Sequence, residues 1–107
     1  MKGFSQLITD SELPVLVDFH ADWCAPCHLM APVLQDIARE MKDRVRIIKI
    51  DVDRNPEAAR KYGIRGIPTF ILFFKGSILW RGSGVMQHQQ LKNILFESLT
   101  THLNGKT

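Results

Sequence analysis

The sequence predicts a single α/β domain over residues 1–107, in which a mixed, four-stranded β-sheet is flanked by helices on both faces. Short apolar, β-branched runs alternate along the chain with segments whose apolar residues recur at helical spacing. Hydrophobic residues make up 45% of the chain and charged residues 23%, the balance of an ordinary globular protein. No linker, internal repeat or low-complexity segment divides the 107 residues, so one domain is expected.

The order of the elements predicts how the sheet is built. Strands are expected at residues 14–19, 45–52, 68–74 and 78–81. Helices are expected at residues 4–9, 25–42 and 56–62, and in a last amphipathic segment that ends near Leu99. A helix joins the first two strands, which should therefore run parallel with a right-handed crossover. A tight turn joins the last two strands, which should form an antiparallel hairpin, so the sheet is mixed.

Charge and apolar patterning exclude several classes of protein. The net charge of +3 is a mild basic bias that no run of Lys or Arg concentrates, which argues against nucleic-acid binding. No apolar run approaches the length of a membrane span. Residues 1–6 lack the apolar core of a signal peptide, so a cytoplasmic location is expected, although a signal peptide removed earlier would leave no trace.

The chain has only two cysteines, Cys24 and Cys27, and their spacing indicates a site and not a structural scaffold. A structural zinc ion needs four ligands, and only His20 and His28 could complete such a set, so no metal is expected. An iron–sulfur cluster shared between two chains is an equally poor fit. Cys24-Ala25-Pro26-Cys27-His28 also matches the Cys-x-x-Cys-His pattern of covalent haem attachment. Haem attachment belongs to mostly helical folds, whereas a buried strand leads into this motif.

A redox reading of the two cysteines accounts for more of the surrounding residues. The strand that ends before the motif and the helix that starts at it place Cys24 at a helix N-terminus, where backbone N–H groups and the helix dipole favour a thiolate. Pro26 suits the first helical turn, where no backbone donor is needed. Cys27 lies one turn further on. Cys24 is therefore the expected nucleophile and Cys27 the thiol that resolves the mixed disulfide.

Asp18 is an acid inside the apolar run Val15-Leu16-Val17-Asp18-Phe19, so it should lie near the core. Burial raises the pKa of a carboxyl group. Such a group can accept the proton of Cys27 when that thiol attacks. The alternative is an acid paired with a lysine for structure alone.

Several motifs, in order along the chain, resemble the thioredoxin family over about residues 4–103. The first two are Val17-Asp18-Phe19-x-Ala21-x-Trp23-Cys24-x-Pro26-Cys27, the active-site strand and turn, and Pro32 in the following helix. The others are Lys49-x-Asp51-x-Asp53-x-Asn55-Pro56, Tyr62-Gly63-Ile64-Arg65-Gly66-Ile67-Pro68-Thr69, and Gly84. Together these motifs are highly specific, and they imply the thioredoxin fold.

The resemblance implies roles for individual residues. Pro68 matches the family's cis-proline facing the cysteines, and with Ile67 it would offer a backbone edge to an extended substrate. Trp23, Gly66, Ile67, Gly84 and Val85 match the apolar docking surface. Asp18 matches the buried carboxylate behind Cys27, and Lys49 its partner.

The chain departs from the family's pattern beside the cysteines. Ala25-Pro26 replaces the usual Gly-Pro, and alanine restricts the backbone more than glycine, which can shift the reduction potential. His20 stands where the family commonly has Trp, and His28 lies four residues after Cys24 on one helix face. A charged imidazole there would stabilise the Cys24 thiolate. The alternative for both histidines is an ordinary polar residue.

The N-terminus is a further departure, because residues 4–9 already look like the first helix and the family's usual first strand has no counterpart. The strand near residues 45–50 should then be an edge of the sheet. An apolar open edge invites pairing with another chain, so weak self-association at Arg46-Ile47-Ile48 is expected.

These observations lead to one functional prediction, a protein-disulfide reductase that works through the Cys24–Cys27 couple without a bound cofactor. The resemblance implies protein disulfides as substrates and an NADPH-dependent flavoprotein reductase as electron donor, with no nucleic-acid or membrane partner. The alternatives are a disulfide oxidase or isomerase, a thioredoxin-fold binding subunit without turnover, and the haem carrier.

Overall fold

The computed structural model describes residues 2–104. Its strands are β1 (Val15–His20), β2 (Arg46–Asp51), β3 (Thr69–Phe74) and β4 (Ser77–Ser83). Its helices are α1 (Lys2–Asp10), α2 (Ala25–Glu40), α3 (Pro56–Lys61) and α4 (His88–Leu99), and a π-helical segment, η1 (Thr100–Asn104), follows α4. The predicted elements are therefore all present, with ends that differ by a few residues.

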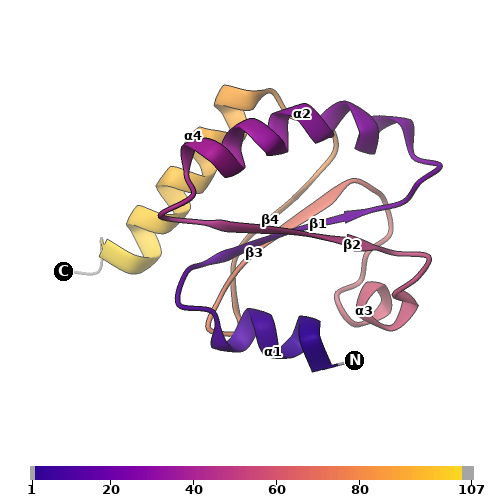
Figure 1. Ribbon diagram of the computed structural model, residues 1–107, viewed down its shortest axis with the longest axis horizontal. Coiled ribbons are helices and arrows are strands. Elements are labelled where there is room, and N and C mark those ends of the chain that lie inside the picture. The colour runs from indigo at the N-terminus through magenta and orange to yellow at the C-terminus, as the bar shows by residue number, and fades with distance from the viewer. Residues whose placement is uncertain (1, 105–107) are drawn as a thin grey trace.

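The four strands form one mixed sheet in the order β2-β1-β3-β4. β1 and β2 are parallel, whereas β3 is antiparallel to both β1 and β4, as predicted. Figure 1 shows α2 and α4 on one face of the sheet and α1 and α3 on the other. The predicted mixed sheet with helices on both faces is therefore confirmed.

The sheet separates two apolar cores. Leu16 of β1 packs with the inner faces of α2 and α4, among them Met30 and Leu91. Val15, Val17 and Phe19 pack on the opposite face with Ile8 of α1 and with residues around α3. Because side chains alternate along a strand, Asp18 and His20 lie on the same face as Leu16, toward α2. The helix that carries Cys27 thus covers the face to which Asp18 belongs.

The β2 strand is an edge of the sheet, as the sequence predicts, and no segment crosses it in Figure 1, where it lies nearest the viewer. Arg46 N–H donates to Pro14 O and Val52 N–H to His20 O, so the even-numbered residues of β2 bond to β1. The backbone groups of Ile47 and Lys49 therefore point outward.

Two features differ from the sequence prediction. The β4 strand runs on to Ser83, beyond the predicted end at residue 81, and its pairing with β3 shifts by one residue between Leu72 and Phe73. Asparagine directly before Pro56 is typical of an N-cap, but the Asn55 side chain makes no cap bond to α3 and instead donates to the carbonyl oxygen of Asp51, at 3.0 Å.

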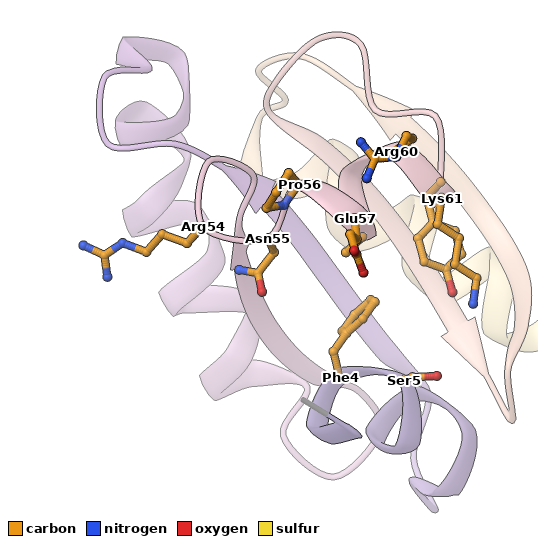
Figure 2. A pocket seen from close by; sticks show the side chains of 10 residues that line it. Phe4, Ser5, Arg54, Asn55, Pro56, Glu57, Arg60 and Lys61 are labelled. Carbon is orange, nitrogen blue, oxygen red and sulfur yellow. The ribbon is translucent and has the colours of Figure 1, made fainter.

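A shallow cavity of about 750 Å³ lies between α1 and the segment around α3. Figure 2 shows the Phe4 ring pointing from α1 toward α3, between exposed side chains such as Arg54 and Lys61. None of the cysteines or their neighbours lines this cavity, and α1 and α3 cover the face of the sheet opposite α2. This cavity is therefore separate from the cysteine pair.

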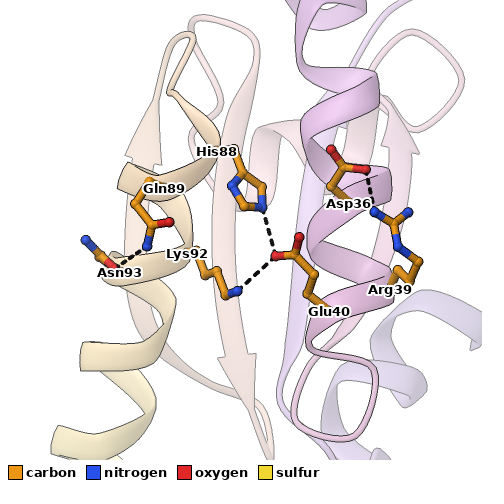
Figure 3. A network of polar contacts seen from close by, with 7 residues as sticks. All are labelled: Asp36, Arg39, Glu40, His88, Gln89, Lys92 and Asn93. Atoms are coloured by element: carbon orange, nitrogen blue, oxygen red, sulfur yellow. Dashed lines mark hydrogen bonds and ion pairs between the residues drawn. The ribbon is translucent and has the colours of Figure 1, made fainter.

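On the other face, Glu40 ties α2 to α4 (Figure 3). One carboxylate oxygen accepts hydrogen bonds from His88 Nε2 at 2.8 Å and Lys92 Nζ at 3.0 Å. The hydrogen bond from Lys92, followed by that from His88, holds the pKa of Glu40 below its ordinary value.

Candidate active site

Cys24 and Cys27 form a disulfide at the start of α2, with their Cα atoms 5.3 Å apart. Cys24 is the N-cap of the helix, and its Sγ accepts the backbone N–H of Cys27 at 3.2 Å. Both cysteines are buried, at 3% and 7% exposure. The N–H bond and the positive end of the helix dipole both stabilise negative charge on the Cys24 sulfur.

The loop before β3 contacts the disulfide from the side. The Ile67–Pro68 peptide bond is cis, and Cys24 Sγ lies 3.8 Å from the carbonyl oxygen of Ile67. The backbone N–H of Gly84 donates to Pro68 O at 2.9 Å, which fixes the segment after β4 beside the same loop. Gly84 has φ of 91°, a conformation that residues with a Cβ rarely adopt. Three segments far apart in the sequence thus meet at one place.

Exposed apolar side chains accompany these segments. Trp23 is 70% exposed and Val85 54% exposed, so both side chains present apolar surface to solvent. The indole N–H of Trp23 donates to Asp53 Oδ2 at 2.8 Å, which orients the ring. Sequence reasoning missed Asp53, although it follows the second strand within Lys49-x-Asp51-x-Asp53. An acid just past a strand end near the motif was the available signal.

Asp18 is buried, with 1% exposure, and its Oδ1 atom has no hydrogen-bond partner among residues 2–104. Burial raises the pKa of this carboxyl group, and the nearby positive charges of His20 and Lys49 oppose the rise. Lys49 lies opposite Asp18 in the register of β1 and β2, but its side chain is exposed and makes no ion pair with Asp18. Lys49 therefore acts on Asp18 through space and not through a hydrogen bond.

The two histidines occupy different environments. His20, the last residue of β1, is half-buried and lies opposite Asp51 in the sheet register. One ring nitrogen of His20 and one carboxylate oxygen each of Asp22 and Asp51 all lie within 4.8 Å of one another. His28 is exposed, and its Nε2 lies 2.7 Å from the carbonyl oxygen of Asp22. The His28 ring is thus turned to the loop before the helix.

The remaining predicted site residues lie on the first turn of α2 and on the loop before β3. Ala25 and Pro26 form the exposed first turn of α2, and Gly66 is exposed beside half-buried Ile67.

The family model named Thioredoxin matches residues 1–97. The chain belongs to the thioredoxin family.

Individual relatives agree with this assignment. "Thioredoxin 1" of Chlorobaculum tepidum is 41% identical over 93 residues, which are 87% of this chain and 92% of the relative. The thioredoxin of Buchnera aphidicola is 45% identical over 92 residues, 86% of this chain and 84% of the relative. "Thioredoxin Y2, chloroplastic" of Arabidopsis thaliana is 43% identical over 97 residues, 91% of this chain and 58% of the relative.

The family and the cysteine pair together establish the class of reaction: the protein is a thioredoxin-type protein dithiol–disulfide oxidoreductase. The homologues and the bonded cysteine pair do not favour the haem-carrier alternative. Within residues 2–104, no helix combines the length and the apolar character required to cross a membrane.

Proposed function

We propose that this thioredoxin reduces protein disulfides, with Cys24 as nucleophile and Cys27 as resolving thiol. The observation that carries the proposal is the position of Cys24 Sγ, which caps α2 beside the Ile67 carbonyl. The Cys24 thiolate attacks one sulfur of the substrate disulfide, whose other sulfur leaves as a thiolate. Cys27 then gives up its proton and attacks Cys24, so the second substrate sulfur leaves. Two electrons pass from the cysteine pair to the substrate.

Asp18 is the base that we propose for the second step. Cys27 is buried at 7% exposure, so bulk base reaches its thiol poorly. Asp18 lies on the face of the sheet that α2 covers, and burial brings its pKa closer to that of a thiol. The unpartnered Oδ1 of Asp18 can accept a proton without breaking an existing hydrogen bond. His20, followed by Lys49, limits the rise in the pKa of Asp18, so the carboxylate form stays accessible.

Substrate binding is proposed at the surface around the disulfide. An extended segment of the substrate would pair with the backbone at Ile67. The apolar surface of Trp23 and Val85 would contact the side chains that flank the substrate disulfide. The substrate segment can approach the backbone closely at four small or cyclic residues, namely Pro26, Gly66, Pro68 and Gly84.

Turnover requires an electron donor, for which we propose an NADPH-dependent flavoprotein thioredoxin reductase. A chain whose only cysteines are the redox pair, and which reduces disulfides, suits a reducing compartment, and we therefore propose the cytoplasm.

The test of the proposed function is trapping of the mixed disulfide. Cys27→Ser should accumulate a covalent complex with a protein substrate through Cys24, whereas Cys24→Ser should accumulate none. A trap that forms only through Cys27 would contradict the assignment. Equilibration of the Cys24–Cys27 couple with glutathione gives its reduction potential and hence the direction of electron flow. A potential as high as that of oxidising folding enzymes would mean that the protein oxidises its substrates and does not reduce them.

Ala25 and His28 are proposed to tune that potential. Ala25→Gly frees the backbone between the cysteines, so a potential unchanged by this substitution would remove Ala25 from consideration. His28→Ala is tested on the titration of the Cys24 thiol, because a charged imidazole near the helix start would favour the thiolate.

We further propose weak self-association through the edge of β2. Asp51 O already accepts both Asn55 N–H and the Asn55 amide, at 2.9 and 3.0 Å. The outward groups that can pair thus belong to Ile47 and Lys49. Antiparallel pairing of Ile47 with Lys49 of a second copy uses all of them and places Ile48 on the two-fold axis. The exposed lysine in the middle of the edge keeps this association weak.

A further inference from the structure

Three side chains of the types that bind metal ions converge at one end of the sheet. His20 is the last residue of β1 and lies opposite Asp51, the last residue of β2. Because paired residues of neighbouring strands point to the same face, both side chains leave the sheet on the same side. Asp22 lies two residues after β1, on the loop that leads into α2. One imidazole and two carboxylates therefore come together there.

The distances between these three groups suit a metal ion. One ring nitrogen of His20 and one carboxylate oxygen each of Asp22 and Asp51 all lie within 4.8 Å of one another. An ion placed between three atoms at this spacing would lie about 2.8 Å or less from each of them. Zn²⁺ takes nitrogen and oxygen ligands at about 2.0–2.2 Å, so each side chain would move by less than about 1 Å to reach it. Small side-chain rotations supply a movement of this size.

Few other partners compete for these groups. In the part of the chain that the structure describes, neither the His20 ring nor the Asp22 carboxylate forms an ion pair or a side-chain hydrogen bond. The Asp51 carboxylate is held in place, because its Oδ1 accepts the backbone N–H of Asp53 at 2.8 Å and that of Arg54 at 3.2 Å. Carboxylates that ligate metal ions are commonly fixed by hydrogen bonds of this kind.

Charge and ligand type indicate the kind of ion. The two carboxylates together carry two negative charges, which a divalent cation neutralises. An imidazole nitrogen favours Zn²⁺ and other transition-metal ions over Mg²⁺ and Ca²⁺, which prefer oxygen ligands. Three protein ligands leave the remaining coordination positions to water.

We propose that His20, Asp22 and Asp51 bind one divalent transition-metal ion, for which Zn²⁺ is the probe. The ion would join the loop before α2 to the end of β2. Trp23 directly follows Asp22, and its indole N–H donates to Asp53, two residues after Asp51. The ion would therefore brace both segments that hold the exposed indole. Binding itself does not depend on the direction of electron flow at the cysteine pair.

The experiment is a Zn²⁺ titration of the oxidised protein, in which the Cys24–Cys27 disulfide keeps both sulfurs from binding the metal. Calorimetry should show one ion per chain at sub-millimolar Zn²⁺. His20→Ala and Asp22→Asn should each weaken binding by at least about tenfold, because loss of a group that merely supports a ligand already costs about 10–100-fold. Asp22 is exposed, so Asp22→Asn should keep the fold even if His20→Ala does not. The ring nitrogen resonances of His20 should shift when Zn²⁺ is added, which identifies the ligand directly.

His88→Ala is the matched control. His88 Nε2 also lies 2.8 Å from a carboxylate oxygen, that of Glu40, but Lys92 Nζ already contacts the same oxygen at 3.0 Å. This variant should therefore bind Zn²⁺ as tightly as the wild type.

Three outcomes would overturn the proposal. The first is a wild-type protein that does not bind Zn²⁺ at sub-millimolar concentration. The second is equal affinity in the wild type, His20→Ala and Asp22→Asn, which would mean an adventitious ion elsewhere on the chain. The third is tighter binding of Mg²⁺ or Ca²⁺ than of Zn²⁺. Trapping of a mixed disulfide by Cys27→Ser uses none of the three ligands, so this proposal and the proposed function fail separately.

Discussion

Asp18→Asn is the sharpest perturbation of this site, because the amide keeps the size of the side chain and removes its proton chemistry. Cys27 is 7% exposed and Asp18 is 1% exposed, so solvent bases substitute poorly for the carboxylate. General bases contribute rate factors of about 10² to 10⁴. We expect the resolving step to slow about 100-fold near neutral pH, while the first attack by Cys24 keeps its rate.

The same substitution should change how stability depends on pH. Burial raises the pKa of Asp18 in the folded protein above its ordinary value of 3.8. Below the ordinary value both the folded and the unfolded chain hold this proton, and burial of the neutral acid carries no ionisation penalty. As pH rises to the folded-state pKa, the unfolded chain loses its proton first, and the free energy of unfolding falls. Each unit of difference corresponds to about 1.4 kcal/mol.

Two measurements check this reasoning. Stopped-flow release of two aryl thiolates separates attack by Cys24 from resolution by Cys27. Urea unfolding at a series of pH values should show a fall in stability above the ordinary pKa in the wild type that Asp18→Asn lacks. If the two proteins share one resolving rate, Asp18 is not the base. If the wild type and Asp18→Asn show the same pH dependence of stability, burial does not raise the pKa of Asp18.

Three further predictions follow from other parts of the fold. Gly82→Ala would place a Cβ 2.5 Å from Cζ2 of Trp80, so we expect urea unfolding to show a loss of about 1–3 kcal/mol, and an unchanged midpoint would mean that the indole moves aside freely. Glu40→Gln should weaken the fall in thermal stability that the wild type shows at acid pH. The pKa of Glu40 is lowered in the folded protein, so its charge stabilises the fold above the ordinary pKa of 4.5, and this stabilisation is lost as pH falls through the folded-state pKa. Coincident curves of unfolding temperature against pH for the wild type and the variant would refute this. Ile48→Cys, in a chain with both active-site cysteines changed to Ser, should oxidise to a disulfide-linked dimer faster than Ile50→Cys in the same background, and the reverse order would rule out the proposed pairing register.

The sheet was largely predictable because its central strands are continuous apolar runs. All but the last residue of β1 and of β3 are buried, so their composition alone marks them as strands. The end of β4 was not predictable, since Gly82 and Ser83 have little strand propensity. Pairing with Phe70 and Thr69 holds them in the sheet nevertheless. Tertiary contact there overrides the local preference.

The site was predictable in its residues and less so in its contacts. Cys24, Ile67 and Gly84 lie far apart in the sequence, and only motifs shared with a family suggested that they meet. The expected pairing of Asp18 with Lys49 has no hydrogen bond in the structure, because strand register fixes the Cα atoms and not the direction of a long side chain. The bond from Trp23 to Asp53 depends on a loop, whose shape no periodicity encodes.

The capping role of Cys24 has a consequence for the change between the oxidised and the reduced form of the protein. Its sulfur accepts the Cys27 N–H while the disulfide is closed, and a thiolate at the same position is a stronger acceptor for the same bond. The first turn of α2 is therefore already arranged for the charge that appears on reduction. Reduction therefore requires no new capping group at the start of α2, because the same Cys24 sulfur can accept the Cys27 N–H in both states.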